Sequence, residues 1–208
     1  MLIKKSLEEF NQILGSDAPA PGGGSVAALS GSLAGELISM VCSLSIGRKA
    51  QEPYQELLTS TQSKVKELSA ALLVRVDTDT EAFQQVMAAF KLPKGNDEEI
   101  ELRKSAIQAG YKEAVKSPMG TAEQCLEVLQ LAEKLKGKFN ENAMSDFGVA
   151  ALMAWAGLEG AIMNVRINLP SIKDENYVSS KEDEVNFMLQ EGNKIKDEIY
   201  KYVSENLA

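Results

Sequence analysis

A run of prolines and glycines near the amino end, followed by a long uncharged segment, constrains this fold most. The run reads Pro-Ala-Pro-Gly-Gly-Gly-Ser over residues 19–25, and residues 26–46 contain a single acidic group, Glu36, before Arg48. Proline cannot continue a preceding helix, whereas consecutive glycines allow the backbone to approach another group closely. We therefore expect a break at the run and then a buried helix over residues 26–46, with Ser25 as its N-cap.

The start of that helix is also a candidate ligand site. Unpaired N–H groups at a helix start point outward together with the positive end of the helix dipole, which suits an anion or a polar group. We therefore predict that Gly22, Gly23, Gly24 and Ser25 contact a ligand; the alternative is a flexible turn with an ordinary cap. Two other glycine motifs are excluded, because a dinucleotide fingerprint needs a preceding strand and an NTPase phosphate loop needs a lysine after its last glycine.

The amino-acid composition limits which partners, catalytic groups and metal ligands this chain can use. The 208 residues carry 30 acidic and 22 basic side chains, a net charge of −8, which argues against a nucleic-acid partner and favours a soluble, cytoplasmic protein. Histidine is absent, so the commonest general base and metal ligand is missing. Cys42 and Cys125 lie in apolar or helical runs without metal-ligand spacing, so we expect reduced thiols in the core and no metal site.

Helical periodicity extends through the chain, and no segment shows the alternation of a β-strand. The predicted class is all-α, a single-domain helical bundle over residues 1–208 with buried central helices. Capping and breaking signals predict helices over residues 7–15, 26–46 and 53–90, one capped by Asp97, one opened by Pro118 and ended by Gly137, one from 146 to 167, and one opened by the capping box at Ser179 and Glu182.

Two predicted helices reach membrane-spanning length, over residues 26–46 and 147–165. Each holds one glutamate, Glu36 or Glu159, and a carboxylate near the centre of a span costs about 2.5–3.5 kcal/mol. Both are rich in small residues, so we expect buried helices in close contact and no membrane partner. Their apolar length exceeds what one bundle of this size covers, and we therefore expect a homodimer through helical faces.

Three aspartates are candidate catalytic groups. Asp79 interrupts the apolar stripe of the helix over 53–90, and a carboxylate there needs a donor partner, a raised pKa or a ligand. Asp77 is turned about 100° from the same stripe, so solvation is its alternative. Asp146 opens the helix over 146–167, where a helix dipole alone favours a carboxylate.

Five short motifs, taken in order, resemble one family. It is the cyclodeaminase/cyclohydrolase family, which comprises the cyclodeaminase half of formiminotransferase-cyclodeaminase and stand-alone methenyltetrahydrofolate cyclohydrolases of serine-cycle type. The similarity runs from about residue 10 to residue 172. The motifs are Ala-Pro-Gly-Gly-Gly-Ser at 20–25, Val-Asp-x-Asp-x-x-Ala-Phe at 76–83, Leu-Pro-Lys at 92–94, Ser-Asp-x-x-Val-Ala at 145–150 and Asn-Val-x-Ile-Asn-Leu at 164–169.

The resemblance implies an all-helical dimer that acts on a folate and uses no metal or cofactor. The expected reaction is formiminotetrahydrofolate cyclodeamination to methenyltetrahydrofolate and ammonia. The alternatives are methenyltetrahydrofolate cyclohydrolysis to formyltetrahydrofolate, and a non-catalytic folate-binding or scaffold protein of the same fold. Both reactions pass through a tetrahedral carbon between two nitrogens beside a positive charge, which suits two carboxylates in different environments.

Each candidate residue then has an expected role. Asp79 is the general acid/base, Asp146 the charge partner or orienting group, and Asp77 the further catalytic candidate. The glycine loop lies against the pterin or the reacting centre through its N–H groups, and Asn164 of the last motif joins the substrate-binding set. Arg48, Lys49 or Lys94 pairs with the carboxylates of the folate tail; the alternative for these cations is a solvated or dipole-capping position.

Overall fold

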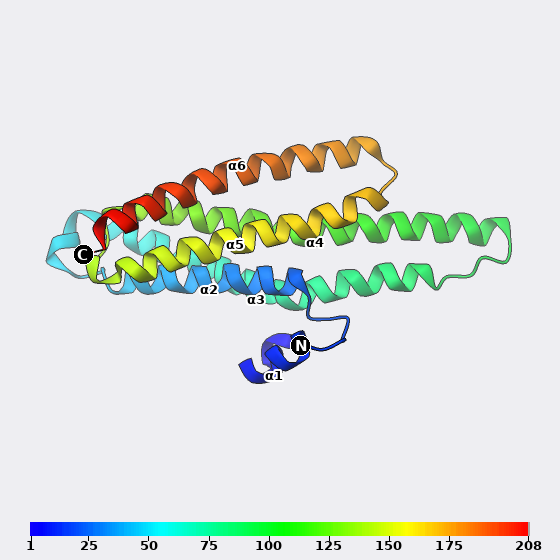
Figure 1. Cartoon of the computed structure of the whole chain (residues 1–208), viewed down its shortest axis with the longest axis horizontal. Coiled ribbons are helices and arrows are strands. Elements are labelled where there is room, and N and C mark those ends of the chain that lie inside the picture. Colours follow the sequence, from blue (N-terminus) through cyan, green and yellow to red (C-terminus); the bar gives the residue numbers. More distant parts are fainter. Residues whose placement is uncertain (208) are drawn as a thin grey trace.

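The computed structural model describes residues 1–207, and within helix α3 the side chains of residues 79–83 lie outside the described part. The described chain is helical and contains no β-strand, which confirms the predicted all-α class (Figure 1). The elements are η1 (Leu2–Lys4), α1 (Leu7–Leu14), α2 (Gly23–Ser43), η2 (Lys49–Tyr54), α3 (Gln55–Phe90), α4 (Asp97–Leu135), η3 (Glu141–Ala143), α5 (Met144–Asn168), η4 (Leu169–Ser171) and α6 (Glu175–Asn206).

Helix α2 is packed between α3 and α5, and small residues set the separation of these helices. A Cβ atom added to Gly31 of α2 would lie 2.4 Å from the Sγ atom of Cys125 in α4, and one added to Gly157 of α5 would lie 2.8 Å from the backbone oxygen of Ala27. On the other side of α2, a Cβ atom on Gly35 would lie 3.1 Å from the backbone oxygen of Val65 in α3. The close approach predicted from the small residues of this segment is therefore present on both sides of α2.

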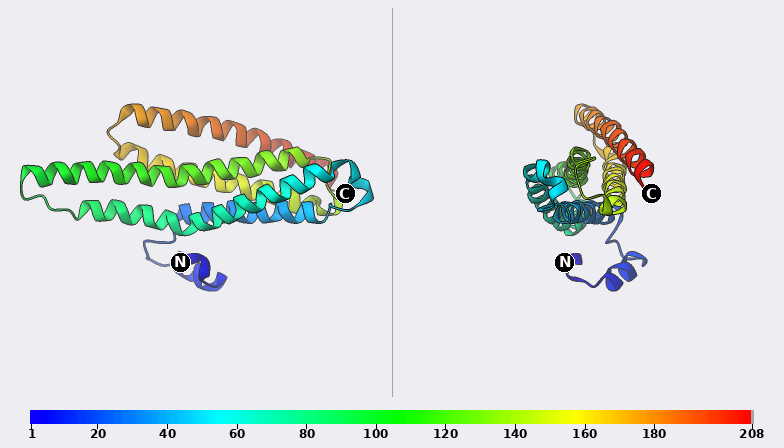
Figure 2. Two further views of the ribbon diagram at one scale, coloured as in Figure 1. Left: turned by 180° about the vertical axis from the view of Figure 1, so that it is seen from behind. Right: turned by 90° about the vertical axis from the view of Figure 1, so that its left-hand side faces the viewer.

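The direction of the helices determines which ends meet. Gly23, at the start of α2, lies against the side chain of Asn164 near the end of α5, and Gly31 lies against Gly157. Helices α2 and α5 are therefore antiparallel, and the glycine run shares one end of the bundle with the last turns of α5. The hairpin of α3 and α4 projects beyond α2 and α5 at that end (Figures 1 and 2).

Several large apolar residues of α2 and α5 point away from the core, although others, such as Ile38 and Phe147, are buried in it. Leu33 is 47% exposed on α2, and Met163 and Ile167 are 61% and 77% exposed on α5. Both helices are long and apolar enough to cross a membrane, yet 67% of the α2 window and 44% of the window around α5 are buried inside the bundle. Small residues face inward on these helices, and an uncovered apolar stripe remains on each.

Pro118 does not open a helix, contrary to the sequence prediction. It lies inside the continuous helix α4, where proline cannot donate to the carbonyl of Ala114 four residues earlier. That carbonyl instead accepts a hydrogen bond from Nδ2 of Asn168 on α5, at 3.4 Å. The neighbouring Ser117 carbonyl accepts one from the Arg75 guanidinium of α3, at 3.2 Å. The donor from Asn168 thus satisfies the carbonyl that the proline leaves free, and α4 continues through this point.

Three predicted helix caps were also placed wrongly. Helix α2 begins at Gly23 with Gly22 as its N-cap, so Ser25 is already inside the helix. Helix α4 is capped by Asn96, and Asp97 is its first residue. Helix α6 begins at Glu175 with Asp174 as its cap, ahead of the predicted start at Ser179. At α4 and α6, an earlier polar residue accepts a free N–H group of the first turn. At α2, the backbone is already helical before Ser25.

Gly31→Ala tests the helix contact that sets this packing. The added methyl group would meet both the Cys125 sulfur and the Leu72 side chain, so we expect the free energy of unfolding to fall by about 1–3 kcal/mol. Chemical denaturation measures the change. Gly15→Ala is the control, because its Cβ atom would be no closer than 3.5 Å to any other group. The double variant Gly31→Ala/Cys125→Ala should recover part of the loss, and equal stability of Gly31→Ala and wild type would contradict the account.

The two thiols give a second prediction. Cys42 and Cys125 are buried and unpaired, as the sequence predicts, and burial raises the pKa of each thiol to about 12. An unfolded cysteine has a pKa of about 8.5, so the folded protein should resist iodoacetamide at that pH, whereas the denatured chain should react at both sites. Because the unfolded chain releases these protons first, the thiols also lower stability as pH rises from about 8.5 towards 12. Rapid labelling of the folded protein would contradict the burial.

Candidate functional site

A cavity of about 440 Å³ lies where the start of α2 meets the ends of α3 and α5 and the middle of α4. Its walls include Gly22 and Gly23 of α2, Phe90 of α3, and Tyr111 of α4, and none of the described residues that line it carries a charge. It is open at one side, where Ile167 is 77% exposed. The site therefore suits a largely neutral, partly apolar group that needs only a few polar contacts.

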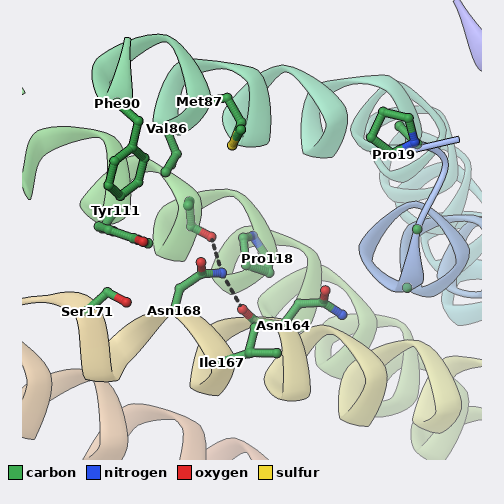
Figure 3. A pocket seen from close by; sticks show the side chains of 14 residues that line it. Pro19, Val86, Met87, Phe90, Tyr111, Pro118, Asn164, Ile167, Asn168 and Ser171 are labelled. Carbon is green, nitrogen blue, oxygen red and sulfur yellow. Dashed lines mark hydrogen bonds between the residues drawn. The ribbon is translucent and has the colours of Figure 1, made fainter. Parts of the chain in front are cut away.

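The wall formed by α5 presents two amides one helical turn apart. Asn164 donates from Nδ2 to the Gly160 carbonyl at 2.8 Å. Asn168 donates from Nδ2 to the Asn164 carbonyl at 2.8 Å and also to Ala114, as described above (Figure 3). Both side chains are half-buried and line the cavity. Their amino groups are held by backbone carbonyls, and their amide oxygens remain available as hydrogen-bond acceptors.

The opposite wall is aromatic and apolar. The rings of Phe90 and Tyr111 pack edge to face, with centroids 6.3 Å apart and an interplanar angle of 84°. The Arg103 guanidinium lies 5.7 Å from the Phe90 ring and donates to the Phe90 carbonyl at 3.0 Å. In Figure 3, Phe90, Val86 and Met87 stand across the cavity from Asn164 and Asn168. A flat ring between these walls would contact apolar carbon on one side and amide groups on the other.

Only part of the glycine run faces this cavity. Gly22 and Gly23 line it, and the first N–H groups of α2 have no side-chain cap. Gly24 and Ser25 are buried, and the Ser25 hydroxyl donates to the Val76 carbonyl of α3 at 2.8 Å. Ser25 therefore joins the start of α2 to α3 just before Asp77, and within one chain it has a structural contact in place of the predicted contact with a ligand.

Asp77 lies on the other side of the proline segment. Its Oδ1 atom accepts the backbone N–H of Leu2, and its Oδ2 atom is buried without a hydrogen-bond donor among the described residues. A second cavity, of about 550 Å³, is lined by Asp77 and Lys5 and shares Pro19 and Ala20 with the first. Asp77 is half-buried and lines this cavity, so both its catalytic role and its solvated alternative stay predictions. A buried carboxylate oxygen without a protein donor is costly unless another group satisfies it, which keeps Asp77 among the candidates.

The Asp79 side chain lies outside the described residues, so its predicted role stays a prediction. Its backbone belongs to α3, between Thr78, which lines the second cavity, and Val86, which lines the first. The segment that carries Asp79 therefore runs between the two cavities.

Asp146 and Arg48 lie at the opposite end of the bundle. The 18 residues from Asp146 to Asn164 span about 27 Å of α5 at 1.5 Å per residue. Arg48 donates from Nε to the Leu44 carbonyl at 2.6 Å and lines a separate hollow with Asn140 and Glu141. This contact is the dipole-capping alternative for Arg48. Within one chain, Asp146 and Arg48 do not reach the cavity.

Lys94 is exposed in the connection between α3 and α4 and does not line the cavity either. The structure thus brings together Gly22, Gly23 and Asn164 from the predicted set, and separates Lys94 and the residues of the far end from them.

Comparison with known proteins identifies the family to which this arrangement of helices and motifs belongs. The family model described as formiminotransferase-cyclodeaminase matches residues 6–187. The chain belongs to the formiminotransferase-cyclodeaminase family. The resemblance drawn from the five short motifs is therefore confirmed over most of the chain.

Relatives within the family carry two different names. The chain is 37% identical over 207 residues to a methenyltetrahydrofolate cyclohydrolase from Methylorubrum extorquens, with 100% of both chains covered. It is 35% identical to a formimidoyltransferase-cyclodeaminase from Gallus gallus, where 91% of this chain matches 35% of the longer protein. A crystal structure of formiminotetrahydrofolate cyclodeaminase from Thermotoga maritima superposes with a TM-score of 0.81 at 28% identity, covering 100% of this chain and 98% of the other.

Most residues that line the cavity were not among the predicted site residues, including Phe90, Tyr111 and Asn168. Pro118 was predicted only as a helix start. One signal was available for Asn168, which follows Asn164 by one helical turn within the motif at 164–169. Nothing in the sequence pairs Pro118 with Asn168, since a freed carbonyl and its donor are 54 positions apart.

Among the described residues, no three histidine, cysteine, aspartate or glutamate side chains lie close enough together to hold a metal ion. The absence of a metal or other cofactor in the reaction stays a prediction from the missing histidines and the family resemblance.

Proposed function

We propose that this protein is an enzyme of folate one-carbon metabolism, a formiminotetrahydrofolate cyclodeaminase that forms methenyltetrahydrofolate and releases ammonia. The observation that carries the proposal is the cavity at the glycine-rich start of α2, whose described lining is uncharged and whose amide and aromatic walls suit a neutral bicyclic ring. Membership of the family supports it, as does the match in fold and length to a cyclodeaminase from Thermotoga maritima.

The chemistry that such a site has to perform is modest. The N10 nitrogen, which lies outside the pterin ring, attacks the formimino carbon carried on the ring nitrogen N5 and loses its proton. The resulting tetrahedral carbon expels ammonia after a proton reaches the leaving nitrogen, and the methenyl bridge between N5 and N10 remains. N–H groups at the start of α2 face the cavity and stabilise negative charge or a lone pair. An acid on the α3 segment next to the cavity supplies and removes protons, and Asp79 is our candidate.

Cyclohydrolysis is the second candidate function. It is favoured by the methenyltetrahydrofolate cyclohydrolase from Methylorubrum extorquens, which this chain matches along the full length of both proteins. In that reaction, water adds to the methenyl carbon and the ring opens to formyltetrahydrofolate. The tetrahedral centre and proton transfers are of the same kind, so the same cavity serves either reaction.

Two absorbance assays test the proposal, with protein first dialysed against a chelator. A cyclodeaminase produces the methenyl chromophore from the formimino substrate and releases ammonia, whereas a cyclohydrolase removes that chromophore faster than a protein-free control. Activity in neither assay would overturn both enzymatic functions and leave a folate-binding or scaffold protein. Activity that returns only after a divalent ion is added would contradict the metal-free prediction.

Asp79→Asn tests the proposed acid. The substitution keeps the shape of the side chain while removing charge and proton transfer, so we expect kcat to fall by about 10²–10⁴-fold with the fold intact. Circular dichroism and thermal melting monitor the fold, and the absorbance assay measures the rate. A destabilised variant that turns over normally would remove Asp79 from the mechanism.

Asp77→Asn and Asp146→Asn are the comparators. Asp77→Asn retains the oxygen that accepts from Leu2 and supplies an amide in place of the unpaired oxygen. If Asp77 carries the proton, its variant shows the large fall in kcat and Asp79→Asn does not. Asp146→Asn shows whether kcat depends on a charge at the far end of the bundle, independently of Asp77 and Asp79.

We also propose that the protein works in the cytoplasm as a homodimer. The uncovered apolar stripes on α2 and α5 support this, since the exposed residues of both point away from the core that these neighbouring helices share. A two-fold axis through this face that sets the helices of the two copies antiparallel would bring the Asp146 and Arg48 end of one copy towards the cavity of the other. The roles predicted for Asp146 and Arg48 depend on such an arrangement.

Light scattering checks the dimer against a monomer mass of 22.6 kDa. We expect twice that mass at micromolar concentration, and a monomer for Leu33→Glu, because a charge in an apolar interface is not tolerated. Leu102→Glu is the matched control, since Leu102 is 62% exposed on α4, away from these stripes. A monomeric wild type, or dissociation of both variants alike, would contradict the proposed face.

A further inference from the structure

In the two cavity asparagines, Asn164 and Asn168, the amino group donates to the protein backbone while the amide oxygen has no protein donor among the described residues. The amino group of each is committed to a backbone carbonyl, Gly160 for Asn164, and both Asn164 and Ala114 for Asn168. These bonds determine which atom of each amide is nitrogen. The two Oδ1 atoms receive no donor from the described residues, and each retains acceptor capacity towards the cavity.

Pro118 fixes the second amide in this orientation. A residue other than proline at position 118 would donate its own N–H to the Ala114 carbonyl and leave the Asn168 amino group with one partner fewer. The bond from Asn168 to Ala114 therefore exists because α4 contains a proline at this point. Pro118 itself lines the same cavity, so the helix irregularity and the amide that compensates for it lie at one site (Figure 3).

The remaining walls define what these acceptors meet. Phe90 and Tyr111 face them across the cavity, and the first turn of α2 offers N–H groups at a third side. A flat heterocycle that fits this space presents N–H donors towards α5 and an acceptor towards α2. The lining residues that the structure describes include no cation, so the carboxylates of a substrate tail find no partner among them.

We propose that the Oδ1 atoms of Asn164 and Asn168 accept hydrogen bonds from the N–H donors of the pyrimidine edge of the pterin, namely N3–H and the 2-amino group. This inference rests on the proposed folate substrate and adds the orientation of its ring: the amino-pyrimidine edge faces α5 and the tail leaves through the open side. Asn168 and Asn164 determine specificity, and Pro118 is a positioning residue that acts through Asn168.

Isothermal titration of the full-length protein with two ligands tests the orientation. The first is 5-formyltetrahydrofolate, and the second is its 2-desamino-2-methyl analogue, which lacks the amino donor but keeps the ring. We expect wild type to bind the analogue about tenfold or more weakly, because a buried acceptor then loses its donor. Asn168→Leu and Asn164→Leu should weaken binding of the first ligand, and at least one should bind the two ligands equally.

The control and second variants keep the test decisive. Asn176→Leu, at an exposed position of α6, should discriminate like wild type. If a leucine variant fails to fold, Asn168→Ser replaces it, since a serine hydroxyl can donate to the Asn164 carbonyl but lacks the amide oxygen. Pro118→Ala should reduce discrimination by a smaller factor than the Asn168 variants while the far-ultraviolet spectrum stays helical.

The outcomes separate this inference from the proposed function. Equal affinity of wild type for both ligands, or full discrimination by every Asn164 and Asn168 variant, would overturn the ring orientation and leave the folate function standing. Failure of wild type to bind either ligand would overturn the folate function itself. Unchanged discrimination in Pro118→Ala would remove Pro118 from its positioning role.

Discussion

The close contact between α2 and α5 is the constraint on which the rest of the structure depends. Gly31 and Gly157 face each other there, and the Cys125 thiol of α4 fills the space that their missing side chains leave. Because the helices are antiparallel and in contact, this contact fixes the axial position of one helix relative to the other. The same register places Gly23 beside Asn164 and so forms one corner of the cavity. A packing requirement in the centre of the bundle thus determines the geometry of a site near its end.

This constraint also explains the unusual distribution of apolar residues. Where small side chains face the neighbouring helices at the closest contacts, several large ones, among them Leu33, Met163 and Ile167, point outward. An isolated bundle leaves this apolar surface in water, at a cost of about 25 cal/mol for each Å² that a partner would cover. The feature that lets the central helices approach each other is therefore the same feature that favours assembly.

The sequence predicted the class and most helices because periodicity of apolar residues is a local signal that burial enforces. It failed at Pro118 because the rule that proline ends a helix assumes that the freed carbonyl stays unpaired, and Asn168 supplies a donor from another helix. It placed Asp146 and Asn164 in one helix, which the structure confirms for α5, but membership of one helix does not bring two residues together, and about 27 Å separates them along its axis. Sequence motifs predicted Gly22, Gly23 and Asn164 at the site. They could not predict the wall formed by Phe90 and Tyr111, because it depends on tertiary contacts between α3 and α4.

The separation of charge from the cavity has a chemical consequence for the reaction. A cationic methenyl or protonated formimino group is stabilised by a carboxylate, but a carboxylate inside the ring pocket would also repel the carboxylates of a folate tail. In this structure the described cavity walls are neutral, and Asp77 lines the adjoining cavity, which shares Pro19 and Ala20 with the first. Under the proposed function, neutral dipoles recognise the ring, while the acid comes from the α3 segment that carries Asp77 and Asp79. Ring recognition and proton transfer then belong to different helices, α5 and α3, and the Ser25 contact to Val76 links the start of α2 to α3.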